Sequence, residues 1–268
     1  IPGYTHLQRA QRVTVGHHLL AWVEMLGRDR ERFRFAQGQA APSPLGAGAL
    51  AGSTLPLPPP PGDLVRNSLD AVADRDFALD YLYAGAALFT HLSRIGEELV
   101  VWSSSEFGFV SLPEDAATGS SMMPQKLNPD VAELARGKAG TAIGRLTGLL
   151  ATVKGLPLAY NRDLQEDKQA VFAERADLGK ALPALSALIG GLRFDRDRLE
   201  AASSDPTLLA TDAAEALVRA GVPFREAHEQ VAAQVRAGTF EPPAPGERPR
   251  PGPGGVEEAL ADARARFA

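Results

Sequence analysis

The stretch FALDYLYAGAALFTHLSRIGEELVV, residues 77–101, decides the fold class. Its large apolar side chains recur three or four residues apart, which is the period of one face of an α-helix. They are Leu79, Leu82, Phe89, Leu92, Ile95 and Leu99. Alanines between them spread apolar surface around most of the circumference, and a helix of that kind is buried inside a bundle. The sequence therefore predicts an all-α protein built on long helices.

Helical periodicity recurs on both sides of this stretch. Residues 14–35 carry it before, and after it the run Asn128-Pro129-Asp130 predicts a helix to about Val153, with Asn128 as its N-cap. Loops are expected at 39–63 and 103–123, the second with a small hairpin at 107–110. Further helices are predicted at 167–192, 212–220, 224–237 and 256–267.

Glycines recur in the predicted helix that follows Asn128. They stand at spacings of three or four, as Gly137, Gly140, Gly144 and Gly148. Each glycine destabilises a helix by about 1 kcal/mol relative to alanine. We therefore expect these glycines to serve a structural role that offsets this cost. Small side chains allow two helices to approach closely, and we predict close helix packing at these positions.

Composition narrows the class of protein. The chain carries a net charge of −5 and no cysteine, so a basic surface for nucleic acid and a thiolate nucleophile are both excluded. It contains no apolar run of the length that a membrane span needs, which is about 18 residues. We expect a soluble cytoplasmic protein with neither nucleic acid nor membrane as partner. The chain begins at Ile1 without a methionine, and we expect upstream sequence to be missing.

Three polar islands interrupt the helical pattern, and the first is GYTHLQ at residues 3–8. Histidine exchanges protons near neutral pH, and His6 stands here beside hydroxyl and amide side chains. The plainer interpretation, that His6 is a loop or capping residue, stays open from these residues alone.

The second island is TGSSMMPQKLNPD, residues 118–130. Glycine and serines predict a mobile loop, and Lys126 supplies a positive charge two residues before a helix start, where backbone amides attract anions. Lysine is scarce, because 268 residues contain only five. The island therefore predicts a site that binds a carboxylate and stabilises a carbanion.

The third island is YNRDLQEDK, residues 160–168, which leads into a predicted helix. A solvated helix start explains its polarity equally simply. The alternative is a binding strip for a polar, zwitterionic ligand.

These islands carry a resemblance to a known family. Residues 119–128 resemble the signature loop of the fumarase/aspartase superfamily, and GYTHLQ together with DLQEDK at 163–168 resembles argininosuccinate lyase and its lens relative δ-crystallin. Similar sequence extends through NSLDAV (67–72) and GVPFREAH (221–228), to about Phe240.

The resemblance implies a fold and a reaction. The fold is a long-helix bundle in residues 1–160, with a catalytic loop at 117–128. A substrate strip in 161–268 continues into the bundle, followed by a smaller C-terminal helical region. Six prolines and four glycines in residues 241–255 separately predict a stiff linker there, which has no counterpart in the family. The reaction is reversible β-elimination of argininosuccinate to arginine and fumarate. The implied assembly is a homotetramer with active sites shared between subunits, and no metal or organic cofactor is implied.

The resemblance also assigns roles to residues. Ser120 is the general base, and His6 is a proton relay or acid oriented by Glu133. Lys126 is catalytic and, with Asn128, binds and stabilises the substrate carboxylate. Thr5 lies at the substrate, and Tyr160, Gln165 and Lys168 hold its citrulline-like half.

The chemistry agrees with the residue types. Removing a proton from carbon beside a carboxylate builds negative charge, and one well-placed donor lowers such a barrier by about 3 kcal/mol.

Adenylosuccinate lyase or fumarase is an alternative with the same chemistry. A non-catalytic oligomer of the δ-crystallin kind, or an inactive truncated product, is the alternative from another class. Family members carry a further region before the Thr5-His6 motif, so we expect this chain alone to show little activity.

Overall fold

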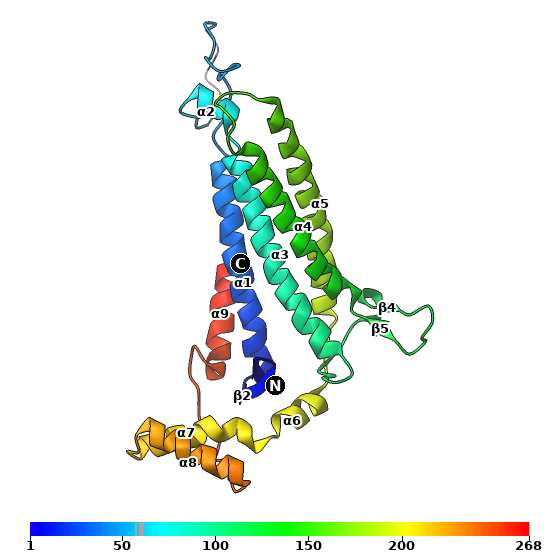
Figure 1. Ribbon diagram of the computed structural model, residues 1–268, viewed down its shortest axis with the longest axis vertical. Coiled ribbons are helices and arrows are strands. Elements are labelled where there is room, and N and C mark those ends of the chain that lie inside the picture. Colours follow the sequence, from blue (N-terminus) through cyan, green and yellow to red (C-terminus); the bar gives the residue numbers. More distant parts are fainter. Residues whose placement is uncertain (57, 59–61, 268) are drawn as a thin grey trace. The chain divides into compact units, whose positions relative to one another are not determined.

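The structure is a computed structural model that describes residues 1–56, 58 and 62–267. The predicted all-α class is confirmed, because long helices dominate and the strands are short (Figure 1). Residues 57 and 59–61 of the loop expected at 39–63 lie outside the described residues. The helices are α1 (Val15–Gln39), α2 (Ser68–Ala73), α3 (Asp76–Ser103), α4 (Asp130–Val153), α5 (Asp167–Gly190), α6 (Arg196–Ser203), α7 (Ala210–Arg219), α8 (Phe224–Ala237) and α9 (Val256–Phe267).

The chain divides into two compact units, each of which is described by itself. The terminal unit comprises residues 1–24, 105–111 and 194–268, and the bundle unit comprises residues 25–104 and 112–193. Each unit is therefore discontinuous in sequence. The domain boundary predicted at residue 160 lies within the bundle unit.

Helix α3 is the central element of the bundle unit. Helices α3, α4 and α5 run side by side in Figure 1, and α3 contacts both of the others. Its side chains Leu82, Phe89 and Leu99 are fully buried. Leu82 packs in one cluster with Leu149 of α4, and Val171 of α5 lies against it. Burial against helices on several sides explains why apolar residues cover nearly the whole circumference of α3.

Close helix packing occurs in this bundle, but on α3 rather than at the predicted α4 positions. A Cβ atom added at Gly96 would lie 2.5 Å from the carbonyl oxygen of Ala132 in α4. By contrast, no atom of the described residues lies within 4 Å of a Cβ added at the α4 glycines 137, 140, 144 and 148. The prediction of close packing there is wrong within the described part of this chain, because those glycines are exposed.

We predict that Gly96→Ala destabilises the bundle unit by about 1 to 3 kcal/mol, because the new methyl group forces two backbones apart. Urea unfolding followed by circular dichroism measures the change. Gly38→Ala in α1 is the matched control, since the part of the chain that the structure describes has no atom within 4 Å of its Cβ position. Equal stabilities of the two variants would contradict the close approach of α3 and α4.

A charged network joins α4 to α5 in the bundle interior. Arg145 donates to Glu174 at 2.8 Å and to Asp177 at 2.6 Å, and Lys138 donates to Asp177 at 2.6 Å. Burial raises the pKa of Glu174, which is fully buried, although the hydrogen bond from Arg145 opposes that effect. Burial also acts to raise the pKa of Asp177, but hydrogen bonds from its two cations outweigh burial and lower it. Charges paired across two helices fix their register, since a slip would leave buried charge unpaired.

The terminal unit has its own small core, and hydrogen bonds attach the proline-rich linker at 241–255 to it. Ala214 of α7 packs with Ala227 and Val231 of α8. The buried carboxylate of Asp212 accepts from the backbone of Gly246 at 2.9 Å and from Arg248 at 2.7 Å. The predicted linker at 241–255 is therefore anchored to α7.

A hairpin predicted at residues 107–110 is wrong. Phe107 and Phe109 instead pack their rings 5.4 Å apart, and the ring of Tyr4 lies 5.6 Å from that of Phe107. Strand β3 begins only at Val110. Gly108 has a φ of 60°, which turns the chain between the two rings.

No helix among residues 1–56, 58 and 62–267 is long and apolar enough to cross a membrane.

Candidate active site

The predicted site residues fall in both units. Thr5 and His6 belong to the terminal unit, whereas the signature loop (117–128), Glu133 and the 160–168 strip belong to the bundle unit. Their geometry is therefore given within each unit.

The signature loop is a hairpin immediately before α4. Strand β4 (Thr118–Gly119) pairs antiparallel with β5 (Leu127–Asn128), and Figure 1 shows the loop projecting beyond the end of α4. The backbone of Ser120 donates to the carbonyl of Lys126 at 3.2 Å, which closes the hairpin. Ser120 and Lys126 are therefore brought to the same closed end of one loop. Met122 at its tip is 86% exposed, so the loop makes little contact with the rest of its unit.

The Ser120 hydroxyl has two backbone N–H donors as hydrogen-bond partners. Its Oγ accepts from the backbone N–H of Met122 at 3.2 Å and of Met123 at 3.0 Å. Two amides aimed at one hydroxyl oxygen stabilise negative charge on that oxygen, as in an oxyanion hole. This arrangement makes a serine alkoxide easier to form.

The prediction that Asn128 caps α4 is wrong. Helix α4 starts at Asp130 with Pro129 at its N-cap position, and no side chain makes a capping hydrogen bond there. Asn128 lies in β5 and pairs with Thr118, so the hairpin holds its backbone in extended conformation. Asn128 itself lies between the loop and the first turn of α4, where free N–H groups favour an anion.

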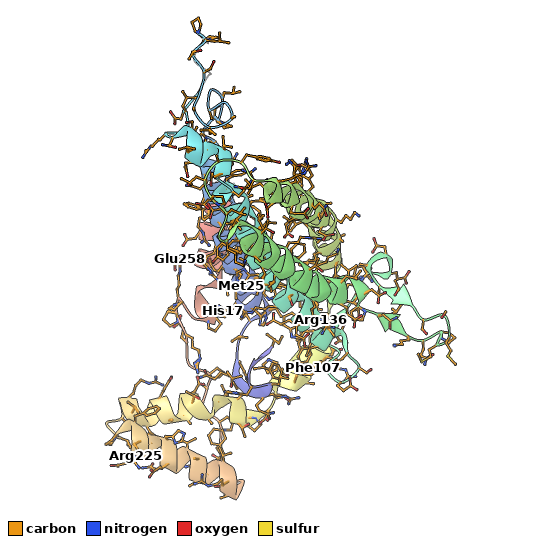
Figure 2. All side chains as sticks on the ribbon, turned by 45° about the horizontal axis from the view of Figure 1, so that its top comes forward. His17, Met25, Phe107, Arg136, Arg225 and Glu258 are labelled. Atoms are coloured by element: carbon orange, nitrogen blue, oxygen red, sulfur yellow. The ribbon has the colours of Figure 1, made fainter. Side chains whose placement is uncertain are left out.

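Glu133 lies in the first turn of α4 and has a basic partner on the same helix. Arg136, labelled in Figure 2, approaches Glu133 at 3.5 Å and Glu97 of α3 at 2.5 Å. Arg136 therefore links the first turn of α4 to α3. The predicted orientation of Glu133 towards His6 stays a prediction.

Thr5 and His6 lie at the tip of a second hairpin. Strand β1 (Pro2–Thr5) pairs with β2 (Gln8–Arg12), and the turn consists of His6 and Leu7. Both turn residues have positive φ, at 55° and 57°. Such a backbone is uncommon for residues other than glycine, and it concentrates at functional sites. The hairpin thus presents Thr5 and His6 at an exposed tip.

The 160–168 strip brings its three predicted residues into one short segment. A 3₁₀ turn at Arg162–Glu166 is anchored by the buried Leu164, and Gln165 donates to the hydroxyl of Tyr160 at 2.5 Å. Lys168 follows in the first turn of α5, where its ammonium lies 3.3 Å from Asp167. Tyr160, Gln165 and Lys168 are all exposed residues.

Two candidate functional residues were not predicted from the sequence, namely Arg75 and Asp167. Asp167 stood in the quoted run DLQEDK as one of four charged residues, with nothing to mark it as buried. Arg75 bonds to it at 2.5 Å across 92 positions of sequence, a pairing that no local pattern reveals.

Among the residues that the structure describes, no group of three or more His, Asp or Glu side chains is placed to hold a metal ion.

Comparison with protein families identifies two matching regions. Residues 1–144 match a family described as lyase, and residues 207–240 match the argininosuccinate lyase C-terminal family. The first match covers the hairpin with Thr5 and His6, the signature loop and Glu133. The second covers α7 and α8.

Curated relatives agree with these matches. The chain is 57% identical over 238 residues to an argininosuccinate lyase of Anaeromyxobacter dehalogenans, and 57% identical over 237 residues to one of Frankia casuarinae. Each alignment covers 86% of this chain and 51% of the relative, so the chain spans about half the length of the curated relatives it matches.

Solved structures share the fold. An EDDS lyase in complex with formate superimposes with a TM-score of 0.82 at 25% identity, covering 99% of this chain and 63% of that chain. A class II fumarase from Schistosoma mansoni gives a TM-score of 0.75 at 16% identity, covering 98% and 57%. The predicted fumarase/aspartase type of bundle is confirmed. The chain belongs to the lyase family, and its resemblance to argininosuccinate lyases is confirmed by relatives at 57% identity.

Proposed function

We propose that this chain supplies the catalytic loop and the substrate strip of an enzyme that cleaves argininosuccinate to arginine and fumarate. The observation that carries the proposal is the Ser120 hydroxyl, which two backbone amides hold on a loop shared with Lys126. The identity of 57% to argininosuccinate lyases supports the choice of substrate. The proposed role is in arginine biosynthesis in the cytoplasm.

The reaction begins with removal of a proton from carbon. The Ser120 alkoxide takes a proton from the succinyl carbon next to a carboxylate, and the electron pair moves into that carboxylate as an aci-carboxylate. Lys126 and Asn128 stabilise the growing negative charge electrostatically. No metal or organic cofactor is needed for this step.

The second step breaks the carbon–nitrogen bond. The electron pair returns to form the double bond of fumarate, and the guanidino nitrogen leaves and takes up a proton. His6, oriented by Glu133, delivers that proton directly or through water. Thr5 binds the succinyl half, while Tyr160, Gln165 and Lys168 hold the amino-acid half that departs as arginine.

Substrate choice is tested in a chimaeric enzyme, in which this chain replaces the matching segment of the Anaeromyxobacter dehalogenans argininosuccinate lyase. We expect the chimaeric enzyme to use argininosuccinate far better than adenylosuccinate or malate, because the 160–168 strip suits an amino-acid group. A preference for adenylosuccinate or malate would assign the chain to a related lyase. A folded chimaeric enzyme that consumes none of them would favour the non-catalytic oligomer.

We further propose a homotetramer with active sites shared between subunits. Helix α3 offers little surface for this assembly, because most of its large apolar side chains are buried within the chain. Exposed apolar surface lies instead on α4 and α5, at Leu134, Ile143, Leu150, Phe172 and Leu182. The open glycines of α4 accompany it and leave room for a helix from another subunit.

We predict that the 268-residue chain is tetrameric in solution and that Ile143→Glu breaks the tetramer, because the variant buries an unpaired charge in the proposed interface. Light scattering measures the mass of each. Gln37→Glu on the exposed end of α1 is the control and should leave the mass unchanged. A monomeric parent chain, or a variant that stays tetrameric, would contradict the interface.

A further inference from the structure

The carboxylate of Asp167 lies between two cations at the start of α5. Its Oδ2 accepts from Nε of Arg75 at 2.5 Å, and its Oδ1 lies 3.3 Å from Nζ of Lys168. The side chains of Arg75 and Asp167 are only 15% and 12% exposed, whereas that of Lys168 is 55% exposed. One nearly buried carboxylate therefore connects a nearly buried guanidinium to an accessible ammonium group.

Arg75 is itself held in place. It stands at the N-cap position of α3, immediately after α2, and its NH1 group donates to the backbone carbonyls of Asp74 at 2.5 Å and Val72 at 3.4 Å. A guanidinium presents several donors in a fixed plane, so these bonds orient Nε towards Asp167. The turn between α2 and α3 thus fixes one oxygen of the carboxylate.

The other carboxylate oxygen of Asp167, Oδ1, accepts a hydrogen bond from Lys168. A lysine side chain is flexible, with four rotatable bonds. A ligand that binds its ammonium group therefore loses affinity to the conformational entropy of ordering that side chain. The contact with Asp167 restricts Lys168 before a ligand arrives. An ammonium group has three N–H donors, so one contact leaves donors for a ligand carboxylate.

We propose that Arg75 and Asp167 are positioning residues for Lys168, and that through it they set the affinity for the α-amino-acid end of the substrate. The identity of that ligand rests on the proposed function; the positioning of Lys168 does not. Neither residue is proposed to touch substrate, because the side chains of both are nearly buried.

The first experiment measures positioning in the 268-residue chain itself. The chain has five lysines, so acylation of each by a trace of acetic anhydride is resolved by mass spectrometry. An ammonium group paired with a carboxylate reacts more slowly with the reagent, so Asp167→Asn should speed acylation of Lys168 by about threefold. Lys154 is the internal reference and should not change. An unchanged Lys168 rate in Asp167→Asn overturns the proposal.

The second experiment measures the consequence in the chimaeric enzyme. Asp167→Asn and Arg75→Gln should each raise KM for argininosuccinate by about tenfold and leave kcat within about twofold. In a Lys168→Met background the same changes should have no further effect on KM, because the residue through which they act is absent. A purely structural role would instead lower stability and act equally in both backgrounds.

Arg32→Gln is the matched control, since it breaks a comparable ion pair with the buried Asp29 at 2.9 Å elsewhere in the bundle unit. It should change neither KM nor Lys168 acylation. If the parent chimaeric enzyme fails to cleave argininosuccinate, the proposed function fails and acylation alone decides the positioning claim. If the parent cleaves it and KM is unchanged in the two variants, the positioning claim fails while the function stands.

Discussion

Ser120→Ala in the chimaeric enzyme lowers kcat for argininosuccinate by at least about 10³-fold, since it removes the group that takes the carbon-bound proton. The KM changes little, because the hydroxyl is used by two backbone amides of its own loop and acts on the substrate mainly in the transition state. Folding is also unaffected, because the loop makes few contacts with its unit. Single-turnover fumarate release measures the loss.

Ser121→Ala is the matched control, as it removes the neighbouring hydroxyl of the same exposed loop. It should retain activity within about threefold of the parent. If Ser120→Ala keeps turnover within about tenfold of the parent, Ser120 is not the base.

Lys168→Met raises KM for argininosuccinate by about 10- to 100-fold, which is the range expected when a hydrogen bond to a charged group is lost. The kcat falls by no more than about threefold, because Lys168 binds the half of the substrate that does not react. Steady-state kinetics over a wide substrate range separates the two constants.

Lys154→Met is the control for this substitution. Lys154 is also exposed, but it lies at the C-terminal end of α4, outside the 160–168 strip. An unchanged KM with a collapsed kcat in Lys168→Met would make the strip catalytic and reverse the assigned roles.

Periodic helices could be predicted from the sequence because the pattern of apolar residues is local. The helices α8 and α9 begin and end at the predicted residues, and α3 lies within two residues of its predicted bounds. The predicted N-cap of α4 failed for a different reason. The run Asn128-Pro129-Asp130 has ideal capping chemistry, but pairing of Asn128 with Thr118 competes for the same residue and prevails.

The sequence did not predict the β1–β2 and β4–β5 hairpins, because the residues in their turns are not typical of hairpin turns. A two-residue turn with positive φ favours asparagine and glycine. The turn between β1 and β2 instead contains His6 and Leu7. The pair Arg75 and Asp167 was missed because it joins two distant segments. Residue types alone indicated where the polar islands lie, and only the fold shows which side chains hold Lys168.

Fumarate release from argininosuccinate by the chimaeric enzyme measures whether this chain can complete an active site. If this chain carries the catalytic loop and the substrate strip, kcat/KM stays within about tenfold of that of the parent Anaeromyxobacter dehalogenans enzyme. A chimaeric enzyme that folds and assembles but releases no fumarate would contradict the account.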